Sequence, residues 1–418
     1  MDSRWIEEEA AALTSRFSDQ SDADALLALR VYTSRLIGQD PELAMHGGGN
    51  TSVKVMRDLG NGPEAVLHVK GSGWNLATIE QDGLPGLRLA PLYPLLDGTR
   101  PSDTEMVRIL RGYLLNSAAP TPSVETLLHA FLPARFVEHG HASAVLAIAN
   151  QPEKEQRRIV RELFGSSVIF LSYVFPGFDL SVAGARAQAD HPAATAMWLA
   201  NHGLFTWGDS ARDSYQRFIE IVSKCEAYLA QAGATLPVNP TTGEAGGCAS
   251  LCEKLTELLS ELPTFSDGVF LDPRPLPVLA NSTTLDAAQR GTVTPDHVIR
   301  IKPFALRLHE TSQEMIITEA LEQFTEAYRA YFEAHRYLLP VTPIMLDTAP
   351  RVVHVSDFGV IGIGRSAAEA SINADLAVQN LRVVHSAESL GRYSPLSRDE
   401  QFRIEYWELE QAKLRQKS

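Results

Sequence analysis

One stretch of the chain constrains its fold and chemistry more than any other, namely residues 122–129 (PSVETLLH) followed by 138–141 (EHGH). The first segment predicts a helix over 123–132, because Pro122 suits a helix start. The second lies in a predicted strand over 136–141. Alternate residues of a strand face the same side of a sheet. His139 and His141 therefore present two imidazoles to one point.

Two imidazoles on one side of a strand suit a divalent cation, which needs a third ligand and an open position if it is to catalyse. Residues 201–203 (NHG) offer that ligand, since His202 precedes an apolar strand and Gly203 allows close backbone approach. Zinc suits imidazole, and ligand type also admits cobalt or manganese. Taken alone, the H-x-H pair indicates a half-exposed strand, and Glu125 indicates a solvated acid at a helix start. Their joint order and spacing favour a metal site.

Two glycine-rich turns, 46–52 (HGGGNTS) and 70–73 (KGSG), adjoin predicted strands. Bare N–H groups in such turns bind anions, and nearby hydroxyls can add to the site: Thr51, Ser52 and Ser72. Ordinary tight turns are the alternative interpretation. Lys54 and Lys70 attract a phosphate in one interpretation and are solvated strand ends in the other.

His129 lies four residues after Glu125, so both side chains share one face of the predicted helix. In one interpretation His129 orients Glu125 or the metal ligands. In the other it is a buried histidine with satisfied hydrogen bonds. The sequence leaves both open.

Composition excludes several classes of function. The chain has 418 residues and a net charge of −14, which argues against a nucleic-acid backbone as partner, because such binding needs clustered Lys and Arg. Three irregularly spaced cysteines form no disulfide framework, and we expect Cys248 and Cys252 to be structural or free thiols. There is no secretion signal and no run of ~18 apolar residues. The expected location is the cytoplasm.

The pattern of elements predicts two domains, 1–235 and 250–418, joined by a Gly-, Pro- and Thr-rich linker over 236–249. In the first domain, helices are predicted over 4–17, 22–38, 193–200 and 210–231, and strands over 52–55, 65–69, 168–173 and 204–207. In the second, helices are predicted over 251–262, 313–335, 367–384 and 400–416, and strands over 351–354 and 359–362. Ser21 or Asp22 is the expected N-cap of the second helix.

The first domain resembles the class II aldolase/adducin family. The segments that match fall in order across the domain: 46–54 (HGGGNTSVK), 70–74 (KGSGW), 122–129, 139–141 and 201–203. The resemblance implies an α/β (α+β) fold with a central, mostly antiparallel sheet flanked by helices, followed here by a second, smaller α/β domain. It also implies a homo-oligomer, often a tetramer, with active sites at subunit interfaces.

The same resemblance implies roles for individual residues. His139, His141 and His202 match the metal ligands, with zinc the expected metal, and Glu125 matches the catalytic acid/base. Tyr173 falls near a tyrosine that donates a proton to a neighbouring site in some members. The residues that match a phosphate cradle are Gly49, Asn50, Ser72, Gly73 and Ser123.

The second half resembles the middle part of the longer rhamnulose-1-phosphate aldolase/alcohol dehydrogenase proteins, through 291–303, 351–364 and 405–414. No dinucleotide-binding glycine motif with a downstream Tyr-x-x-x-Lys follows, so we predict no NAD binding. The expected role of 250–418 is packing and oligomerisation. The alternative is that a polar cluster there touches substrate: Asp296, His297, Arg300 and Lys302.

Together these features predict a metal-dependent aldolase that cleaves a ketose 1-phosphate or related hydroxy-ketone through a metal-stabilised enediolate. Two departures from the family pattern leave the substrate and its phosphate open. Val124 stands where fuculose-type enzymes often have a second serine, and Glu138 and Gly140 replace the Asp and Thr of the longer relatives. The alternatives are a decarboxylase of a 3-keto acid, a sugar-phosphate 4-epimerase and a non-catalytic adducin-like interaction domain.

Overall fold

The structure is a computed structural model that describes residues 1–16, 21–238 and 248–409. The chain divides into two compact units: Met1–Ala149 with Glu153–Tyr228, and Asn150–Pro152 with the chain from Leu229 onward. Most of the proposed linker, residues 239–247, lies outside the described residues. The proposed domain limits therefore stay predictions, and each unit is described by itself.

A seven-stranded sheet forms the centre of the first unit within the described residues, in the order β3-β2-β1-β4-β7-β6-β5. All neighbouring strands pair antiparallel except β5 and β6. This confirms the expected mostly antiparallel sheet. The strands are β1 (Asn50–Asp58), β2 (Pro63–Val69), β3 (Gly86–Arg88), β4 (Phe136–Gly140), β5 (Val168–Leu171), β6 (Ala196–Leu199) and β7 (Gly203–Gly208).

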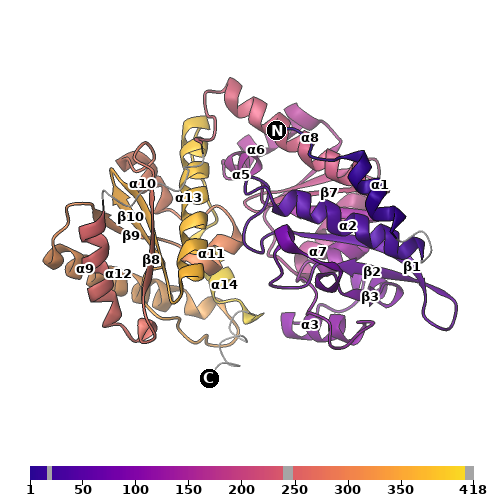
Figure 1. Ribbon diagram of the computed structural model, residues 1–418, viewed down its shortest axis with the longest axis horizontal. Coiled ribbons are helices and arrows are strands. Elements are labelled where there is room, and N and C mark those ends of the chain that lie inside the picture. Colours follow the sequence, from indigo (N-terminus) through magenta and orange to yellow (C-terminus); the bar gives the residue numbers. More distant parts are fainter. Residues whose placement is uncertain (17–20, 239–247, 410–418) are drawn as a thin grey trace. The chain divides into compact units, whose positions relative to one another are not determined.

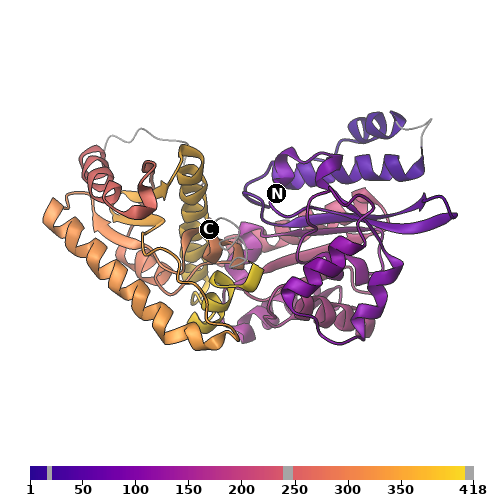
Figure 2. The same cartoon turned by 90° about the horizontal axis from the view of Figure 1, so that it is seen from below.

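Helices flank this sheet on both faces (Figures 1 and 2). In Figure 2 the indigo helices α1 and α2 lie along one face, and the purple segment that carries α3 lies along the other. Apolar residues of α3, α4 and α7 form a buried cluster with those of β2 and β3. The helices are α1 (Glu7–Ser15), α2 (Asp22–Gly38), α3 (Asp103–Gly112), α4 (Thr126–Phe131), α5 (Ser143–Ala149), α6 (Glu153–Phe164), α7 (Phe178–Asp190) and α8 (Ala211–Gln231), with short 3-10 turns at Leu76–Thr78, Gln81–Gly83 and Ala90–Leu96.

Several predicted elements of the first unit are confirmed and two need correction. Ser21 caps α2 as expected, with its side chain accepting from the backbone of Asp24. The helix predicted over 193–200 is wrong: it contains the buried strand β6, which is held between β5 and β7. Four apolar residues in a row carry no periodicity, so tertiary pairing decides their state.

The helix predicted over 123–132 also starts later than expected. Pro122 forms an isolated β-bridge with Gly71, and α4 begins only at Thr126. This later start leaves Ser123 in the turn before the helix and Glu125 at its N-cap, where the carbonyl oxygen of Glu125 accepts from the backbone N–H of His129 while its side chain points elsewhere.

The second unit, within the described residues, holds a four-stranded sheet in the order β8-β11-β10-β9, with β9 and β10 parallel (Figure 1). Its strands are β8 (Phe270–Pro275), β9 (Leu306–His309), β10 (Val352–Ser356) and β11 (Gly359–Gly364). Its helices are α9 (Ala249–Ser260), α10 (Ser282–Ala288), α11 (Pro295–Ile301), α12 (Glu314–His335), α13 (Ala367–Leu390) and α14 (Arg398–Glu405), with 3-10 turns at Pro263–Phe265 and Arg336–Leu338. The helix predicted over 400–416 is thus shorter where it is described, and its end falls outside the described residues.

The smaller sheet shares a buried apolar core with α9, α12 and α14. This arrangement confirms the expected second, smaller α/β part of the chain. Among the described helices of both units, none is long and apolar enough to cross a membrane.

Candidate active site and metal centre

The register of the central strands gathers the candidate site. β4 lies between β1 and β7, so that His139 pairs with Asn50 on one side and Phe205 on the other. Asn50 and His139 face the same side of the sheet, because directly paired residues share a face. Gly49 permits this approach: its φ is +67°, and a Cβ there would lie 2.6 Å from the carbonyl oxygen of His139.

His202 comes from the tight connection between β6 and β7. Asn201, which precedes it, has a φ of 54°, a left-handed conformation that is uncommon for a residue other than glycine. A Cβ on Gly203 would lie 2.6 Å from the carbonyl oxygen of Gly140 and 2.9 Å from Cδ2 of His141. The glycine therefore lets the turn approach the end of β4 closely.

The three predicted histidines converge. One ring nitrogen from each of His139, His141 and His202 lies within 4.8 Å of the others, and all three residues are buried. The Nε2 atoms of His139 and His141 are 3.2 Å apart. The ring centroids of His139 and His202 are 5.0 Å apart. Such convergence brings three imidazoles from two separate segments to one point.

Glu125 completes this cluster. It is the N-cap residue of α4 and is only 4% exposed. Its Oε2 lies 3.4 Å from Nε2 of His139, and its Oε1 lies 3.7 Å from Nε2 of His202. Oε2 also accepts a hydrogen bond of 2.7 Å from the amide of Asn50. Oε1 is buried and has no hydrogen-bond partner among the described residues.

The donor set fits a divalent cation. Nδ1 of His139 lies 3.1 Å from the carbonyl oxygen of Leu204, and this contact makes Nδ1 the protonated nitrogen and leaves the Nε2 lone pair facing the cluster. The His139 ring also stacks on Phe205, with centroids 4.2 Å apart. Nitrogens of the other two imidazoles lie within 4.8 Å of a ring nitrogen of His139, and the buried carboxylate of Glu125 beside them carries a negative charge that a bound cation would balance.

The predicted phosphate-binding segments meet beside this cluster. The backbone N–H of Ser72 donates to Thr121, and that of Ser123 donates to Lys70, at 2.7 and 3.0 Å. The amide of Asn50 reaches Oγ of Ser123 at 3.1 Å. Ser72 and Gly73 are exposed, with a φ of 83° at Gly73. The structure thus joins both glycine-rich turns to the start of α4.

The two lysines considered for phosphate binding have other uses. Nζ of Lys70 donates to the carbonyl oxygens of Gly47 and, at 2.8 Å, Gly49. Nζ of Lys54 donates to the backbone of Leu132 and Ala134, and burial lowers its pKa to about 7. Lys70 therefore holds the first glycine-rich turn, and neither lysine is a solvated strand end.

A buried ion pair supports the site from the opposite face of the sheet, and the sequence reasoning missed it. Arg30 of α2 bonds Glu138, and the side chains of both residues are 0% exposed. Arg30 also donates to the backbone oxygens of Ser52 and Val137, at 3.1 and 3.2 Å. These bonds tie β1 to β4 beside His139. The available signal was an arginine within the apolar run of the second predicted helix.

Tyr173 follows β5, the edge strand, and is half-buried. Two strands, β6 and β7, separate β5 from β4, which carries His139. The structure therefore places Tyr173 after a strand that is separated from the strand of His139 by two others. Its proposed role toward a neighbouring site stays a prediction.

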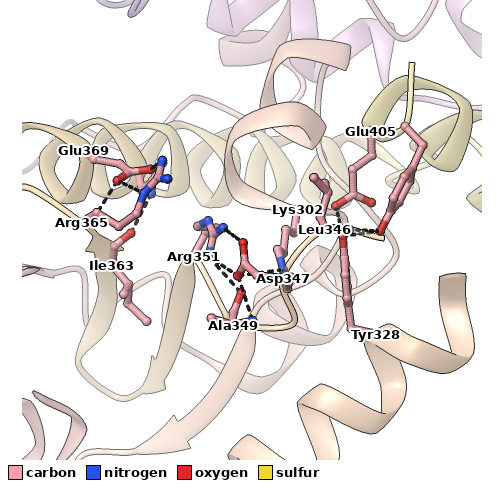
Figure 3. A network of polar contacts seen from close by, with 12 residues as sticks. Lys302, Tyr328, Leu346, Asp347, Ala349, Arg351, Ile363, Arg365, Glu369 and Glu405 are labelled. Carbon is pink, nitrogen blue, oxygen red and sulfur yellow. Dashed lines mark hydrogen bonds and ion pairs between the residues drawn. The ribbon is translucent and has the colours of Figure 1, made fainter. Parts of the chain in front are cut away.

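Two members of the polar cluster considered in the second unit, His297 and Lys302, are buried within the fold, and Figure 3 shows the contacts around Lys302. Lys302 is 3% exposed, bonds the backbone of Asp347, and places Nζ 3.8 Å from the centre of the Tyr328 ring. Tyr328 donates to Glu405 at 2.6 Å. Burial lowers the pKa of Lys302 to about 7 and raises that of Glu405 to about 7. His297 is likewise buried, and its Nδ1 lies 2.8 Å from the hydroxyl of Thr294.

The three cysteines are free thiols. Sγ of Cys248 lies 3.6 Å from Sγ of Cys252, at the start of α9. Cys225 is fully buried, and burial raises its pKa. These contacts agree with structural or free thiols, as expected.

Two family models match the chain. "Class II Aldolase and Adducin N-terminal domain" matches residues 29–229, and "Aldolase class II, second domain" matches residues 268–414. The first matched segment contains β1, α4, β4 and the β6–β7 turn, which carry the cluster. The chain belongs to the class II aldolase and adducin family.

One named relative is similar to most of this chain. The chain is 31% identical over 403 residues to the "Uncharacterized oxidoreductase YuxG" of Bacillus subtilis, a match that covers 92% of this chain and 57% of that protein. The chain thus spans little more than half the length of this relative.

Solved structures also resemble the chain. The N-terminal class II aldolase domain of a conserved protein from Thermoplasma acidophilum is 38% identical, with 55% of this chain and 99% of that chain covered and a TM-score of 0.47. The L-fuculose-1-phosphate aldolase from Thermus thermophilus is 18% identical, with 49% and 95% covered and a TM-score of 0.32.

Proposed function

We propose that this protein is a divalent-metal-dependent aldolase that cleaves a ketose 1-phosphate or a related hydroxy-ketone. One observation carries the proposal: three buried imidazoles converge on one point with the carboxylate of Glu125 lying 3.4 Å from the first of them. Carbon–carbon cleavage beside a carbonyl needs an electrophile for the carbonyl oxygen and a group that moves a proton. The cluster contains candidates for both.

The three histidines would hold the cation, and zinc suits three imidazoles with one position left open. When bound, such a cation supplies a Lewis acid that polarises a carbonyl. The protein's contribution is to fix the imidazoles. The contact of His139 with Leu204 sets its ring orientation, and Gly203 allows His202 to approach β4.

Glu125 is the proposed acid/base. Asn50 holds its Oε2, so the buried Oε1 is the oxygen that is left to take up and return a proton. A general base must lie within hydrogen-bond reach of the proton it moves. The turn before α4 fixes the carboxylate beside the histidines and keeps it away from bulk water.

The glycine-rich turns are the proposed anion-binding part of the site. The exposed residues Ser72 and Gly73 lie next to Ser123, and Gly49 and Asn50 lie beyond it. Because the N–H of Ser72 is bonded to Thr121, the donors proposed here are the Ser72 hydroxyl and the N–H of Gly73. Backbone N–H groups at such turns bind phosphate without a fixed cation. The buried bonds of Lys70 keep the first turn in place for this role.

The assembly and the second unit belong to the same proposal. We propose a homo-oligomer in which Tyr173 donates a proton to a neighbouring copy's site, and in which residues 250–418 serve packing and oligomerisation. Tyr173→Phe then lowers turnover while the metal content stays that of the unchanged protein. An unchanged turnover number in Tyr173→Phe would remove that residue from the proposal.

The test is cleavage of a panel of ketose 1-phosphates, with dihydroxyacetone phosphate followed by a coupled assay. The samples are the metal-loaded protein, the chelator-stripped protein, His139→Ala and Glu125→Gln. His191→Ala and Glu162→Gln are matched controls, because both of these residues are exposed.

The proposal predicts that cleavage requires metal and His139, and that Glu125→Gln lowers turnover by about 10²–10⁴-fold, the usual contribution of a positioned acid/base. Stoichiometric metal without cleavage of any phosphate would overturn the aldolase proposal in favour of a 3-keto acid decarboxylase or an epimerase. A chain that binds no metal would overturn it in favour of an interaction domain.

A further inference from the structure

A continuous line of buried side-chain hydrogen bonds runs from the sheet to Glu125. The hydroxyl of Ser52 lies 2.8 Å from Nδ1 of His129, and Nε2 of the same ring bonds Oδ1 of Asn50. The amide nitrogen of Asn50 then donates to Oε2 of Glu125 at 2.7 Å. Ser52 and His129 are 0% exposed, so water does not compete for these bonds.

The direction of each bond follows from the chemistry of the groups. A carboxylate accepts only, so Asn50 must turn its NH₂ end toward Glu125 and its oxygen toward His129. That oxygen needs a donor, which makes Nε2 the protonated nitrogen of the His129 ring. Burial lowers the pKa of His129 well below its ordinary value, so the ring is neutral and Nδ1 accepts the proton of the Ser52 hydroxyl.

An asparagine amide is nearly symmetric in shape, and only its partners decide which end points where. Without a donor opposite Oδ1, the present orientation of the Asn50 amide leaves that buried oxygen without its hydrogen bond to His129, and this cost favours a turn of the amide away from it. The reversed amide would set its oxygen against Oε2 of Glu125, two acceptors at hydrogen-bond distance. The carboxylate would then rotate away from its position beside His139 and His202.

We propose that His129 is a positioning residue, which fixes the Asn50 amide so that Asn50 holds one oxygen of Glu125 and leaves the other to move the proton. This inference rests on the proposed function, in which Glu125 is the acid/base. His129 itself touches neither substrate nor metal in this account. Ser52 supports it by fixing the ring tautomer.

The test compares His129→Phe with His129→Gln. Phenylalanine keeps an aromatic ring beside Phe205, whose centroid is 5.4 Å from that of His129, but offers no hydrogen bond. Glutamine keeps an N–H near the place of Nε2. Ser52→Ala is the milder third variant, which removes only the donor to Nδ1. Crystal structures, zinc content and steady-state kinetics are measured for each.

We expect turnover to fall by about 10²-fold in His129→Phe, with KM within about threefold and zinc content unchanged, and to recover at least tenfold in His129→Gln. The structure of His129→Phe should show the carboxylate of Glu125 rotated, and that of His129→Gln should show it in place. Full turnover in His129→Phe, or an unmoved Glu125 in its structure, would overturn the inference.

The crystal structures and the cleavage kinetics together distinguish a failure of this inference from a failure of the proposed function. If the unchanged protein cleaves no ketose 1-phosphate, the proposed function fails, and the crystal structures alone still decide whether His129 positions Glu125. If the unchanged protein cleaves and His129→Phe cleaves equally well, the positioning role fails while the aldolase stands. Loss of zinc together with turnover in both substitutions would assign His129 to general stability and overturn its positioning role.

Discussion

Removing Arg30 should destabilise the first unit strongly, because its partner cannot reach water. Arg30→Met leaves the carboxylate of Glu138 fully buried, and within the described part of the chain only the hydroxyl of Ser214 would still be bonded to it, at 2.9 Å. The substitution also removes the two bonds to the backbone of β1 and β4. Breaking a buried pair by removing one partner costs about 3–5 kcal/mol, and we expect a loss in this range.

Tryptophan fluorescence during urea unfolding measures this loss. Four of the five tryptophans belong to the first unit: Trp5, Trp74, Trp198 and Trp207. Arg186→Met is the matched control, because Arg186 is exposed and such a surface substitution changes stability by less than about 0.5 kcal/mol. The double substitution Arg30→Met with Glu138→Leu should recover most of the loss, since no buried charge remains.

The reasoning fails if Arg30→Met unfolds within about 0.5 kcal/mol of the unchanged protein, the range of an ordinary surface substitution. It fails equally if the double substitution is as unstable as Arg30→Met alone. In that case the loss would come from packing volume, and the uncompensated charge of Glu138 would contribute nothing measurable.

Three further outcomes follow from the structure. Gly203→Ala should weaken zinc binding by about 10–100-fold, because its Cβ would lie 2.9 Å from His141; calorimetric titration against Gly112→Ala, which meets nothing within 4 Å, checks this. Lys70→Met should raise KM for a phosphorylated substrate more than it lowers turnover, because the turn at Gly47 and Gly49 loses its anchor; equal effects in steady-state kinetics would contradict it. In the folded second unit Lys302 has a pKa of about 7, against an ordinary value of 10.5. Between these pH values the unfolded chain therefore binds more protons than the folded one. The free energy of unfolding that this group contributes then rises with pH from about 7 to 10. Urea unfolding at stepped pH should show this rise, with a slope of up to about 1.4 kcal/mol per pH unit, and should show it lost in Lys302→Met.

The residues of the candidate site could be predicted where local sequence patterns indicate them. His139 and His141 alternate on one strand, so their common direction follows from strand geometry alone. Glu125 stands before an apolar helical segment, and its place at the helix start needs no distant contact. His202 was a candidate third ligand because it precedes an apolar strand, and the family resemblance supported that choice, since nothing local links His202 to β4.

The partners of Glu125 were less predictable, because they depend on strand register. Asn50 meets His139 only through the pairing of β1 with β4, and His129 meets Asn50 only after α4 packs on that face. The sequence showed His129 on the face of Glu125, yet the side-chain connection between them runs through Asn50. A local sequence pattern cannot predict this connection, because Asn50, which joins the two side chains, lies 79 positions from His129.

Parts of the fold could not be predicted from the sequence, for a different physical reason. The apolar run at β6 has no periodicity, and only its place between β5 and β7 makes it a strand. Arg30 and Glu138 are 108 residues apart in the chain, so the sequence around either residue does not predict their ion pair. Burial reverses the usual expectation for both, since a charged residue is normally predicted at the surface.

The central claim is that the three histidines hold the metal with which the protein cleaves its substrate. The most direct measurement adds zinc stepwise to chelator-stripped protein and records cleavage of the best ketose 1-phosphate at each step. The account predicts that turnover rises in proportion to zinc and stops rising at about one zinc per chain, with no rise in His139→Ala and a normal rise in His191→Ala. Full cleavage before any zinc is added, or an equal response in His139→Ala, would contradict it.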